Sequence, residues 1–582
     1  MTTAAAPAPA RGYEERIDPA TGVRYLEVSR RGDALKDDPL LNKGTCFTEA
    51  ERDLFGLRGL IPPAVSTPDE QAARAYENFL RIGDDVARYL FLAALQDRNE
   101  TLFYRLVIDH FDEMIPIIYT PTVGAVCERY SHIYRRPRGI YVSPGDRGRI
   151  AQLLRHAGRD DVRNIVATDN EAILGIGDQG VGGMGIAIGK IALYTAGAGI
   201  HPARGLPIDL DVGTDNESLL ADPLYLGVRH PRLRGEAYFS FLDELVGALA
   251  QVFPGAIVQW EDFANERAFE VLRRYQPLVP SFDDDIQGTG AVVEAGIRTA
   301  LAGIGRRLDD ERIVFFGAGA SGAGCALQVR RALGAAGLSA TDVSRRVLSI
   351  DSRGLILSDR PGLGGHKKEL AADPALLAGW SRSGSSGFSL RDVVANFRPT
   401  ILIGASGQPG AFGEDVIRAM HAGCARPIVL PMSNPTSKME AVPADILAWT
   451  NGAAVVGTGS PCAPVTVAGI THHIGQCNNA FVFPGIGLGA SVAGARSLPD
   501  AAFAAAARAV SDFTGVPTGA GASIFPPLAK LRDVSRVVAA AVAHALIENG
   551  AARPATAAEI DRRLTEAIWE PTYLEYRLTG HT

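Results

Sequence analysis

The chain has 582 residues, 46% of them hydrophobic and 21% charged, which suits roughly three to five folded domains and excludes disorder over most of its length. Lysine and arginine number 58 and aspartate and glutamate 65, and the net charge of −7 argues against a protein that binds nucleic acid through its phosphates. No apolar run approaches the roughly 20 residues that a membrane-spanning helix needs, which argues against a membrane protein.

The N-terminal part of the chain is expected to be a mobile tail followed by a helical domain. Residues 1–22 are rich in alanine and proline, and they lack the basic start and apolar middle of a signal peptide. Residues 77–96 carry apolar side chains at helical spacing, so we predict a helix there, within a helical domain at 23–136. Six scattered cysteines without a C-x-x-C pair fit a reducing compartment, and we predict a cytoplasmic protein.

The pattern changes near residue 160, where short apolar runs begin to end in polar or acidic residues. Three such runs occupy 164–169, 206–211 and 256–262, and helical stretches such as 243–253 lie between them. This alternation predicts an α/β region with a parallel sheet.

A denser series of buried strands follows at 311–457 and predicts a doubly wound, Rossmann-type nucleotide-binding domain. The segment 361–387, rich in glycine and serine, is expected to be a surface excursion, and the alanine-rich residues 490–582 are expected to be helical. The five candidate strands are 312–316, 347–351, 400–404, 427–431 and 453–457.

The first of these strands runs directly into a G-x-G-x-x-G sequence, which a helical run follows. Its glycines permit a tight turn and let the backbone approach a pyrophosphate at the helix N-terminus, although a glycine turn without a ligand is the alternative. The six residues of this loop are Gly317, Ala318, Gly319, Ala320, Ser321 and Gly322. A second match at 175–180 follows a strand less directly, and we interpret it as a tight turn near the substrate.

The end of the second strand is expected to contact the ribose of the cofactor. Asp351 could bind ribose hydroxyls, which favours NAD. The cations Arg353, Lys367 and Lys368 could tolerate the 2′-phosphate of NADP, so both cofactors stay open. We assign Asp351, Ser352 and Arg353 to the cofactor site, with NAD favoured.

Two polar side chains stand out within apolar runs. Lys190 is the only charged residue of 185–200, and burial would lower its pKa toward that of a general base. The alternative is a lysine that reaches the surface. Tyr119 lies in the largely apolar run 114–126, where it is either a core tyrosine with a hydrogen-bond partner or a proton donor.

Acidic residues gather where two predicted strands end, which in an open α/β sheet is where active sites form. Glu261 and Asp262 end one strand, and the run 283–285 precedes a predicted helix at 290–302. Such carboxylates repel one another unless a cation neutralises them, and oxygen ligands suit Mg²⁺ or Mn²⁺. The alternative for 283–285 is capping of the following helix.

Amide-rich turns follow strands of the nucleotide-binding region. Asn434 lies in one of them, and the pair Asn478 and Asn479 lies in another. Neutral amide donors can hold a substrate carboxylate, although ordinary turn chemistry is the alternative. The histidines and the cysteine of 472–477 could suggest a soft metal, but we favour a structural role for them.

Together these motifs resemble those of the malic enzymes over nearly the whole chain. The matching segments are 41–47 (LNKGTCF), 119–124 (YTPTVG), 175–190 (GIGDQGVGGMGIAIGK), 260–265 (WEDFAN), 284–289 (DDIQGT), the Gly317 loop, 433–436 (SNPT) and 475–485 (GQCNNAFVFPG). The resemblance implies metal-dependent oxidative decarboxylation of L-malate to pyruvate and CO₂ with reduction of NAD or NADP. It also implies a homodimer or homotetramer.

The resemblance gives roles to residues already described. Lys190 would be the general base on the malate hydroxyl, and Tyr119 would be the general acid that protonates the enolpyruvate carbon. The ligands of Mn²⁺ or Mg²⁺ would be Glu261, Asp262 and Asp285, with Asp284 beside them. The residues that hold a substrate carboxylate would be Asn434, which also belongs to the cofactor site, Asn478 and Asn479.

The resemblance further implies a discontinuous middle domain, to which the chain returns after the nucleotide-binding domain. We therefore predict a substrate and metal domain at 137–283 and 479–548 and an NAD(P)-binding Rossmann domain at 284–478. A helical C-terminal tail would follow at 549–582.

Two residues depart from the pattern of the family. Ala172 stands where the family commonly has an arginine that binds a substrate carboxylate, and Asp283 stands where an asparagine is usual. The malolactic enzymes, which convert malate to lactate with bound NAD and a metal, also lack this arginine, so their reaction is the alternative. A nucleotide-binding protein that has lost catalysis is a second alternative. The retained YTPT sequence at 119–122 looks more like malic enzyme.

Overall fold

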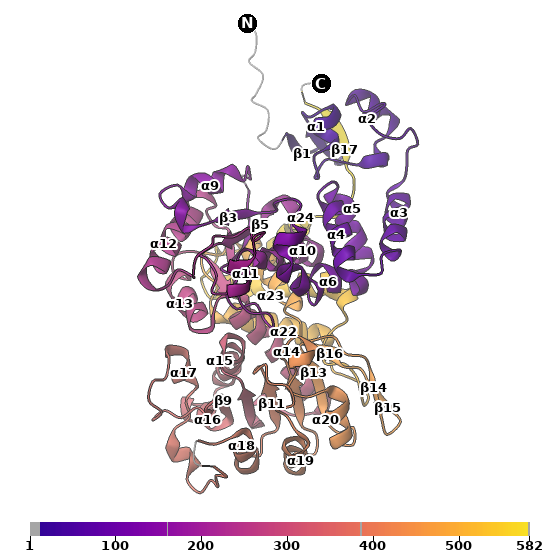
Figure 1. Cartoon of the computed structure of the whole chain (residues 1–582). Coiled ribbons are helices and arrows are strands. Elements are labelled where there is room, and N and C mark those ends of the chain that lie inside the picture. Colours follow the sequence, from indigo (N-terminus) through magenta and orange to yellow (C-terminus); the bar gives the residue numbers. More distant parts are fainter. Residues whose placement is uncertain (1–11, 160, 385–386, 580–582) are drawn as a thin grey trace.

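A five-stranded parallel sheet forms the first half of the scaffold in the computed structural model, which describes residues 12–159, 161–384 and 387–579. Its strands follow the order β3-β5-β4-β6-β7, and every neighbouring pair is parallel. The strands are β3 (Ile140–Val142), β4 (Asn164–Thr168), β5 (Gly205–Leu210), β6 (Ile257–Glu261) and β7 (Ser281–Asp283). Every residue of β4, β5 and β6 is buried, as expected for a parallel sheet covered on both faces. Helices α9 (Ile150–His156), α12 (Gly235–Val252) and α13 (Asn265–Tyr275) flank this sheet (Figure 1).

A seven-stranded sheet forms the second half, in the order β10-β9-β8-β11-β12-β13-β16. Its strands are β8 (Ile313–Phe316), β9 (Val347–Asp351), β10 (Gly354–Leu355), β11 (Ile401–Gly404), β12 (Ile428–Pro431), β13 (Val455–Thr458) and β16 (Gly475–Gln476). The first strand, β8, lies between β9 and β11, so the chain winds outward in both directions from it, and β10 is antiparallel. The predicted α/β class with a doubly wound, Rossmann-type domain is confirmed.

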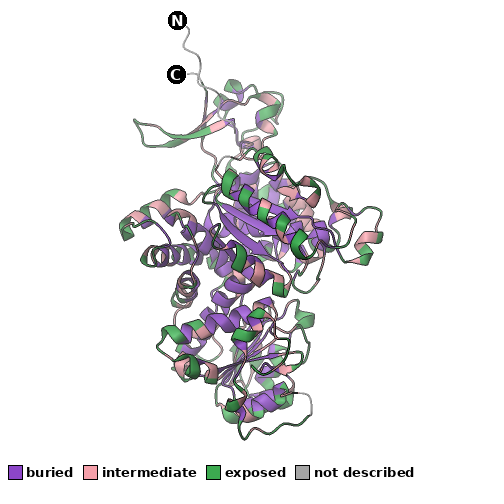
Figure 2. Ribbon diagram, turned by 90° about the vertical axis from the view of Figure 1, so that its left-hand side faces the viewer, coloured by how far each residue is buried: buried purple, intermediate pink, exposed green. Residues whose placement is uncertain are grey.

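The helices that follow the nucleotide-binding region return to the middle of the molecule. They are α21 (Phe483–Ala493), α22 (Asp500–Thr514), α23 (Leu531–Glu548) and α24 (Ala557–Ala567), and Figure 1 shows this part of the chain in yellow and orange at the middle of the molecule. Helices α21 and α23 contact α10 (Met184–Ala198). Gly487 of α21 allows close packing on α10, because a Cβ there would lie 2.4 Å from the ring of Tyr194. Figure 2 shows that the buried residues concentrate in the two sheets and in these central helices. We propose the predicted domain limits, 137–283 with 479–548 and 284–478, on this arrangement.

The remaining elements complete the N-terminal region and the flanks of the sheets. The N-terminal helices are α1 (Gly32–Lys36), α2 (Glu49–Leu54), α3 (Pro68–Leu80), α4 (Asp85–Gln96), α5 (Glu100–Asp109), α6 (Phe111–Ile118), α7 (Thr122–Glu128) and α8 (Tyr130–Ile133). The others are α11 (Glu217–Ala221), α14 (Thr289–Ile304), α15 (Ala320–Ala335), α16 (Ala340–Arg346), α17 (Gly365–Leu370), α18 (Leu390–Phe397), α19 (Glu414–Gly423), α20 (Pro443–Trp449) and the hairpin β14 (Val465–Val467) and β15 (Ile470–His472).

The two ends of the chain pair with each other, which corrects the expected mobile tail at 1–22 and the wholly helical tail at 549–582. Strands β1 (Tyr13–Ile17) and β2 (Arg24–Val28) form an antiparallel pair, and β17 (Glu575–Leu578) adds to β2 in parallel. Arg577 also contacts Asp18 at 2.7 Å. Residues 1–11 and 580–582 of the predicted tails lie outside the described residues.

Three further expectations also need correction. The helix predicted at 77–96 is interrupted after α3, because Asp84 begins α4 by accepting a hydrogen bond from the backbone of Ala87 at 2.8 Å. The stretch Gly180–Ala198 does have the length and apolar composition of a membrane-spanning helix, but 94% of it is buried inside the fold. The segment 361–387 is not wholly a surface excursion, since His366 of α17 is buried and stacks on Phe269.

Candidate active site

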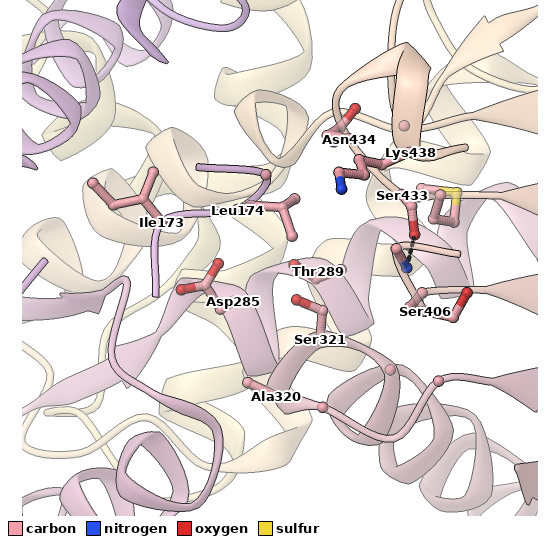
Figure 3. A pocket seen from close by; sticks show the side chains of 18 of the residues that line it. Ile173, Leu174, Asp285, Thr289, Ala320, Ser321, Ser406, Ser433, Asn434 and Lys438 are labelled. Atoms are coloured by element: carbon pink, nitrogen blue, oxygen red, sulfur yellow. Dashed lines mark hydrogen bonds between the residues drawn. The ribbon is translucent and has the colours of Figure 1, made fainter. Parts of the chain in front are cut away.

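A cavity of about 870 Å³ lies where the carboxyl ends of the two sheets meet, and it brings together all but one of the predicted site residues. Side chains from the turn at Ile173 and Leu174, from the acidic region at Asp285 and from the nucleotide-binding region at Asn434 face the same space (Figure 3). The exception is Arg353, which is exposed and does not line the cavity.

The glycine loop occupies the turn between β8 and α15. Gly317 has a φ of 109°, and a Cβ there would lie 2.2 Å from the carbonyl oxygen of Ala405, which follows the neighbouring strand β11. Only glycine fits both demands. Asn265 reaches across from α13 and accepts a hydrogen bond from the backbone of Ala320 at 2.8 Å, which joins the loop to the first sheet. The arrangement matches the phosphate-binding end of a doubly wound sheet.

Asp351 at the end of β9 is held by two cations. Arg360 donates hydrogen bonds to both of its carboxylate oxygens, at 2.7 and 3.0 Å, and Lys367 donates at 3.0 Å. Although burial opposes ionisation, these contacts and the backbone of Arg353 lower the pKa of Asp351. The carboxylate still lines the cavity with Ser352, but its charge is neutralised.

Glu261, Asp262 and Asp285 form a compact carboxylate cluster. Glu261 ends β6, Asp262 follows it, and Asp285 lies in the π-helical turn Asp284–Gly288 after β7. One oxygen from each of the three lies within 4.8 Å of the others, and among the described residues this is the one such group. Asp262 has a φ of 60°, unusual for a residue other than glycine, and its N–H donates to Asp285 at 2.9 Å.

The chemistry of this cluster fits a divalent cation. Among the described residues, buried oxygens of Asp262, Asp283 and Asp284 have no hydrogen-bond partner, which is costly without a positive charge nearby. Burial, with repulsion from Asp285 and Asp284, raises the pKa of Glu261 to about 8, although Lys190 opposes this. Burial and neighbouring carboxylates also raise the pKa of Asp262 well above its usual range. An all-oxygen set of this kind suits Mg²⁺ or Mn²⁺.

Asp283 takes the capping role that was its alternative interpretation. Its carboxylate accepts a hydrogen bond from the backbone of Ile286 at 3.0 Å, at the start of the π-helical turn. Its other oxygen is one of the buried oxygens without a partner, and burial raises its pKa well above the usual range. The carboxyl group of Asp283 is therefore a further group beside the cluster that needs either a proton or a nearby cation.

Lys190 is buried in α10, with 1% of its surface exposed, and does not reach the solvent. Its amine contacts Glu261 at 2.9 Å and also donates to Asp284. Burial lowers the pKa of Lys190, but the carboxylates of Asp284 and Glu261 raise it by more than burial lowers it. The pKa of Lys190 therefore lies well above its usual value. The expected lowered pKa is therefore wrong for the protein without a cation, because the partners outweigh the burial.

Tyr119 follows α6 and faces the same amine. The centre of its ring lies 5.4 Å from the Lys190 nitrogen, and its side chain lines the cavity. Burial raises the pKa of Tyr119 above its usual value, while Lys190 opposes the shift. The phenol therefore keeps its proton at neutral pH and is available as a donor.

The three predicted amides line the cavity but differ in their partners. Asn479 donates to Asp284 at 3.0 Å and to Thr289 at 2.9 Å, so its N–H groups are already used. These hydrogen bonds within the protein therefore compete with the predicted role of Asn479 as a donor to substrate. Asn478 accepts a hydrogen bond from the backbone of Ala480, and Asn434 accepts one from Ser460. Neither amide NH₂ of this pair has a partner among the described residues.

The second glycine match forms a turn of the cavity wall, as interpreted from the sequence. Gly175 has a φ of 87°, and a Cβ there would lie 2.6 Å from Pro435, so this turn packs directly on the segment that carries Asn434. Ala172 just before it is exposed, and its N–H donates to the carbonyl oxygen of Asp262 at 2.9 Å. The position that lacks the expected arginine thus lies beside the carboxylate cluster.

Sequence reasoning missed the functional placement of three residues. Asn265 ends the segment 260–265 (WEDFAN), and Gly324 lies just beyond the glycine loop, where a Cβ would lie 2.3 Å from the carbonyl oxygen of Ile286. Lys438 lines the cavity two residues beyond the SNPT turn. The spacing of the motifs did not indicate the positions of Asn265 and Gly324. For Lys438, a single charged residue beside the SNPT turn could have indicated a role.

Family profiles and curated relatives agree on the family to which the chain is similar. The family profiles described as "Malic enzyme, N-terminal domain" and "Malic enzyme, NAD binding domain" match residues 96–276 and 286–547. The chain is 47% identical to the NAD-dependent malic enzyme of Sodalis glossinidius over 557 residues, covering 96% of this chain and 98% of that protein. It is 45% identical to that of Acinetobacter baylyi over 557 residues, with the same coverage.

Solved structures support the fold. The crystal structure of Entamoeba histolytica malic enzyme is similar with a TM-score of 0.55 at 22% identity, covering 88% of this chain and 92% of that one. Malic enzyme from Pyrococcus horikoshii is similar with a TM-score of 0.51 at 23% identity, covering 78% and 89%. At these identities the likeness concerns the fold alone, while the family profiles and the curated relatives cover most of the sequence. The chain belongs to the malic enzyme family.

Proposed function

We propose that the protein is a NAD-dependent malic enzyme, which oxidatively decarboxylates L-malate to pyruvate and CO₂ with reduction of NAD. The observation that carries the proposal is the convergence of Glu261, Asp262 and Asp285 with Lys190 and Tyr119 in one cleft that also contains the glycine loop. The names of the curated relatives support the same reaction and the same cofactor. Nothing in these comparisons favours the malolactic reaction.

Glu261, Asp262 and Asp285 are the proposed ligands of Mn²⁺ or Mg²⁺. When bound, the cation would supply Lewis acidity toward the oxygens of malate, and NAD would supply the acceptor for the hydride of C2. The proposed cofactor contacts are the backbone of 317–322 with Ser352 and Asp351. Asp351, paired with two cations, offers less negative charge to the ribose than a free carboxylate would.

Lys190 is the proposed general base that accepts the proton of the C2 hydroxyl. A base must be neutral, and two carboxylates favour the charged amine. When Glu261 serves as a cation ligand, the amine loses one of these partners and gains a positive neighbour, and both changes lower its pKa. Asp284 and Asn479 then fix the amine's position through their shared contacts.

Tyr119 is the proposed general acid. Malate and NAD⁺ become pyruvate, CO₂ and NADH with no net release of a proton, so the proton taken from the hydroxyl must return to C3 of the product. Tyr119 lies next to Lys190 and keeps its proton at neutral pH, which suits it to deliver that proton. Asn434 and Asn478, whose NH₂ groups have no partner in the described part of the chain, are the proposed amide donors to substrate carboxylate.

The proposal extends to three properties that rest on the resemblance and the sequence alone. Malate is the small-molecule partner, the protein assembles as a homodimer or homotetramer, and it acts in the cytoplasm. Sedimentation of the purified protein tests the second of these properties.

Product analysis tests the reaction. The enzyme is mixed with malate, Mn²⁺ and either NAD or NADP, and reduced cofactor, pyruvate and lactate are measured together. One reduced cofactor and one pyruvate per malate, faster with NAD, is the expected result. Lactate without net cofactor reduction would support the malolactic reaction, and no turnover would support the inactive alternative.

A further inference from the structure

The cleft lacks the arginine that a dianionic substrate would use at position 172. Three arginines lie nearby in the fold, but each is bound by carboxylates. Arg232 contacts Asp178 at 2.6 Å. Arg234 and Arg267 both contact Glu171 at 2.5 Å, and none of the three arginines lines the cavity. Apart from the proposed cation, neutral amides would face the two substrate carboxylates, so a further positive group is expected to come from elsewhere in the cleft.

Three lysines line the cavity, and two of them are already neutralised. Lys190 is bound by Glu261 and Asp284, and Lys367 is bound by Asp351 at the adenosine end. The backbone N–H of Lys438 donates to Pro435 at 2.8 Å, but its side-chain amine has no ion-pair or hydrogen-bond partner among residues 12–159, 161–384 and 387–579. It is therefore the one uncommitted amine in the described part of this cleft.

The fold brings Lys438 close to the turn that begins at Ala172. Lys438 ends the short 3₁₀ helix Thr436–Lys438, which follows Asn434 and Pro435 directly. Gly175 packs on that same segment, because a Cβ on it would meet Pro435 at 2.6 Å and the carbonyl oxygen of Asn434 at 3.0 Å. In Figure 3 the Lys438 side chain lies beside Asn434, with its amine on the side of Leu174, within the space that Asp285 also faces.

We propose that Lys438 supplies the substrate-binding cation that Ala172 cannot, by pairing with the C1 carboxylate of malate; this inference rests on the proposed function. The choice between the two carboxylates follows from their chemistry. The C4 carboxylate leaves as neutral CO₂, so a cation paired with it would stabilise the ground state and oppose its loss. The C1 carboxylate keeps its charge throughout, so a cation there binds substrate and transition state alike.

Uniform binding has a defined kinetic signature. Removing an interaction that binds substrate and transition state equally raises the KM for malate and leaves kcat nearly unchanged. The Lys438 amine is exposed in the free enzyme, and the loss of one charge-assisted hydrogen bond from such a group should raise the KM for malate roughly tenfold. The KM for NAD should stay unchanged, because the amine would contact malate and not the cofactor phosphates.

The test compares Lys438→Met, Lys438→Arg and the control Lys530→Met in the full chain. Lys530 is an exposed lysine that contacts Asp533 at 3.3 Å and does not line the cleft. Steady-state kinetics give kcat and both KM values, and thermal melts verify folding. Calorimetric titration of malate into nucleotide-free enzyme with Mn²⁺, where no turnover occurs, gives the dissociation constant independently of catalysis.

The expected result is a roughly tenfold weaker malate Kd and higher malate KM for Lys438→Met, with recovery in Lys438→Arg and no change in Lys530→Met. Unchanged malate binding in a folded Lys438→Met would overturn the inference, and so would a rise confined to the KM for NAD. Either result leaves the proposed function intact, whereas a wild-type enzyme that does not oxidise malate would refute that function itself.

Discussion

The Lys190→Met variant should lose turnover and stability while it keeps its affinity for NAD. Methionine fills a volume close to that of the lysine stem but carries no charge and accepts no proton. The amine contacts Glu261 at 2.9 Å and donates to Asp284, and neither of these partners belongs to the glycine loop that is proposed to hold NAD. The substitution therefore removes the proposed base and a buried cation in one step.

The stability loss follows from the burial of all three groups. The side chains of Lys190, Glu261 and Asp284 are 1%, 4% and 0% exposed, so solvent screens none of them. Removing one partner of a buried pair costs about 3–5 kcal/mol in the metal-free protein. The loss should be smaller near pH 6 than near pH 8.5, because burial raises the pKa of Glu261 to about 8 and at lower pH it takes up a proton.

The assay pairs steady-state kinetics with urea unfolding and a fluorescence titration of NAD. Loss of a general base predicts a fall in kcat of about 100- to 10,000-fold. Lys43→Met is the matched control, since Lys43 is also buried and contacts Glu51 at 2.5 Å, but lies in the N-terminal region. It should lose stability comparably and keep its kcat. A Lys190→Met enzyme with near-normal kcat would refute the assignment, and so would a Lys43→Met enzyme with the same loss of turnover.

Three further perturbations test the carboxylate cluster. Asp285→Ala should abolish activity and weaken Mn²⁺ binding in a calorimetric titration, and unaltered affinity would exclude Asp285 as a ligand. Mn²⁺ binding to the wild type should release protons, and its affinity should rise from about pH 6 to 8. The reason is that burial raises the pKa of Glu261 to about 8, and a protonated carboxyl group must lose its proton to bind the cation. Equal heats of binding in buffers of different ionisation enthalpy would contradict this. Gly324→Ala should weaken Mn²⁺ binding and cost about 1–3 kcal/mol of stability, because its Cβ would lie 2.3 Å from the carbonyl oxygen of Ile286. Gly334→Ala, in the same helix with open space around it, should do neither.

Local patterns predicted β4, β5 and β6 of the five-stranded sheet and β8, β9, β11, β12 and β13 of the seven-stranded sheet, because a buried parallel strand is a continuous apolar run. The strand at 347–351 has the predicted limits, and the other predicted strands differ by one or two residues at one or both ends, whereas β3, β10 and β16 were not predicted. The glycine loop was found for the same reason, since its strand, turn and helix are contiguous in the chain. The burial of Lys190 also followed from the apolar run around it.

Local sequence patterns did not predict the properties that depend on residues distant in the chain. The raised pKa of Lys190 comes from Asp284, 94 residues away, and the NH₂ group of Asn479 is used by the same residue from 195 residues away. The strand β1 in the expected N-terminal tail pairs with β2, to which the C-terminal strand β17 also adds, and the paired side chains of Arg577 and Asp18 are 559 residues apart. Periodicity within a short window carries no information about such partners.

Anomalous diffraction at the manganese edge, from crystals grown with Mn²⁺ and malate, tests the central claim most directly. The account predicts one strong peak within coordination distance of carboxylate oxygens from Glu261, Asp262 and Asp285, with malate against it and Lys190 within hydrogen-bonding distance of the C2 oxygen. A peak at other residues, or malate bound away from this cluster, would contradict it.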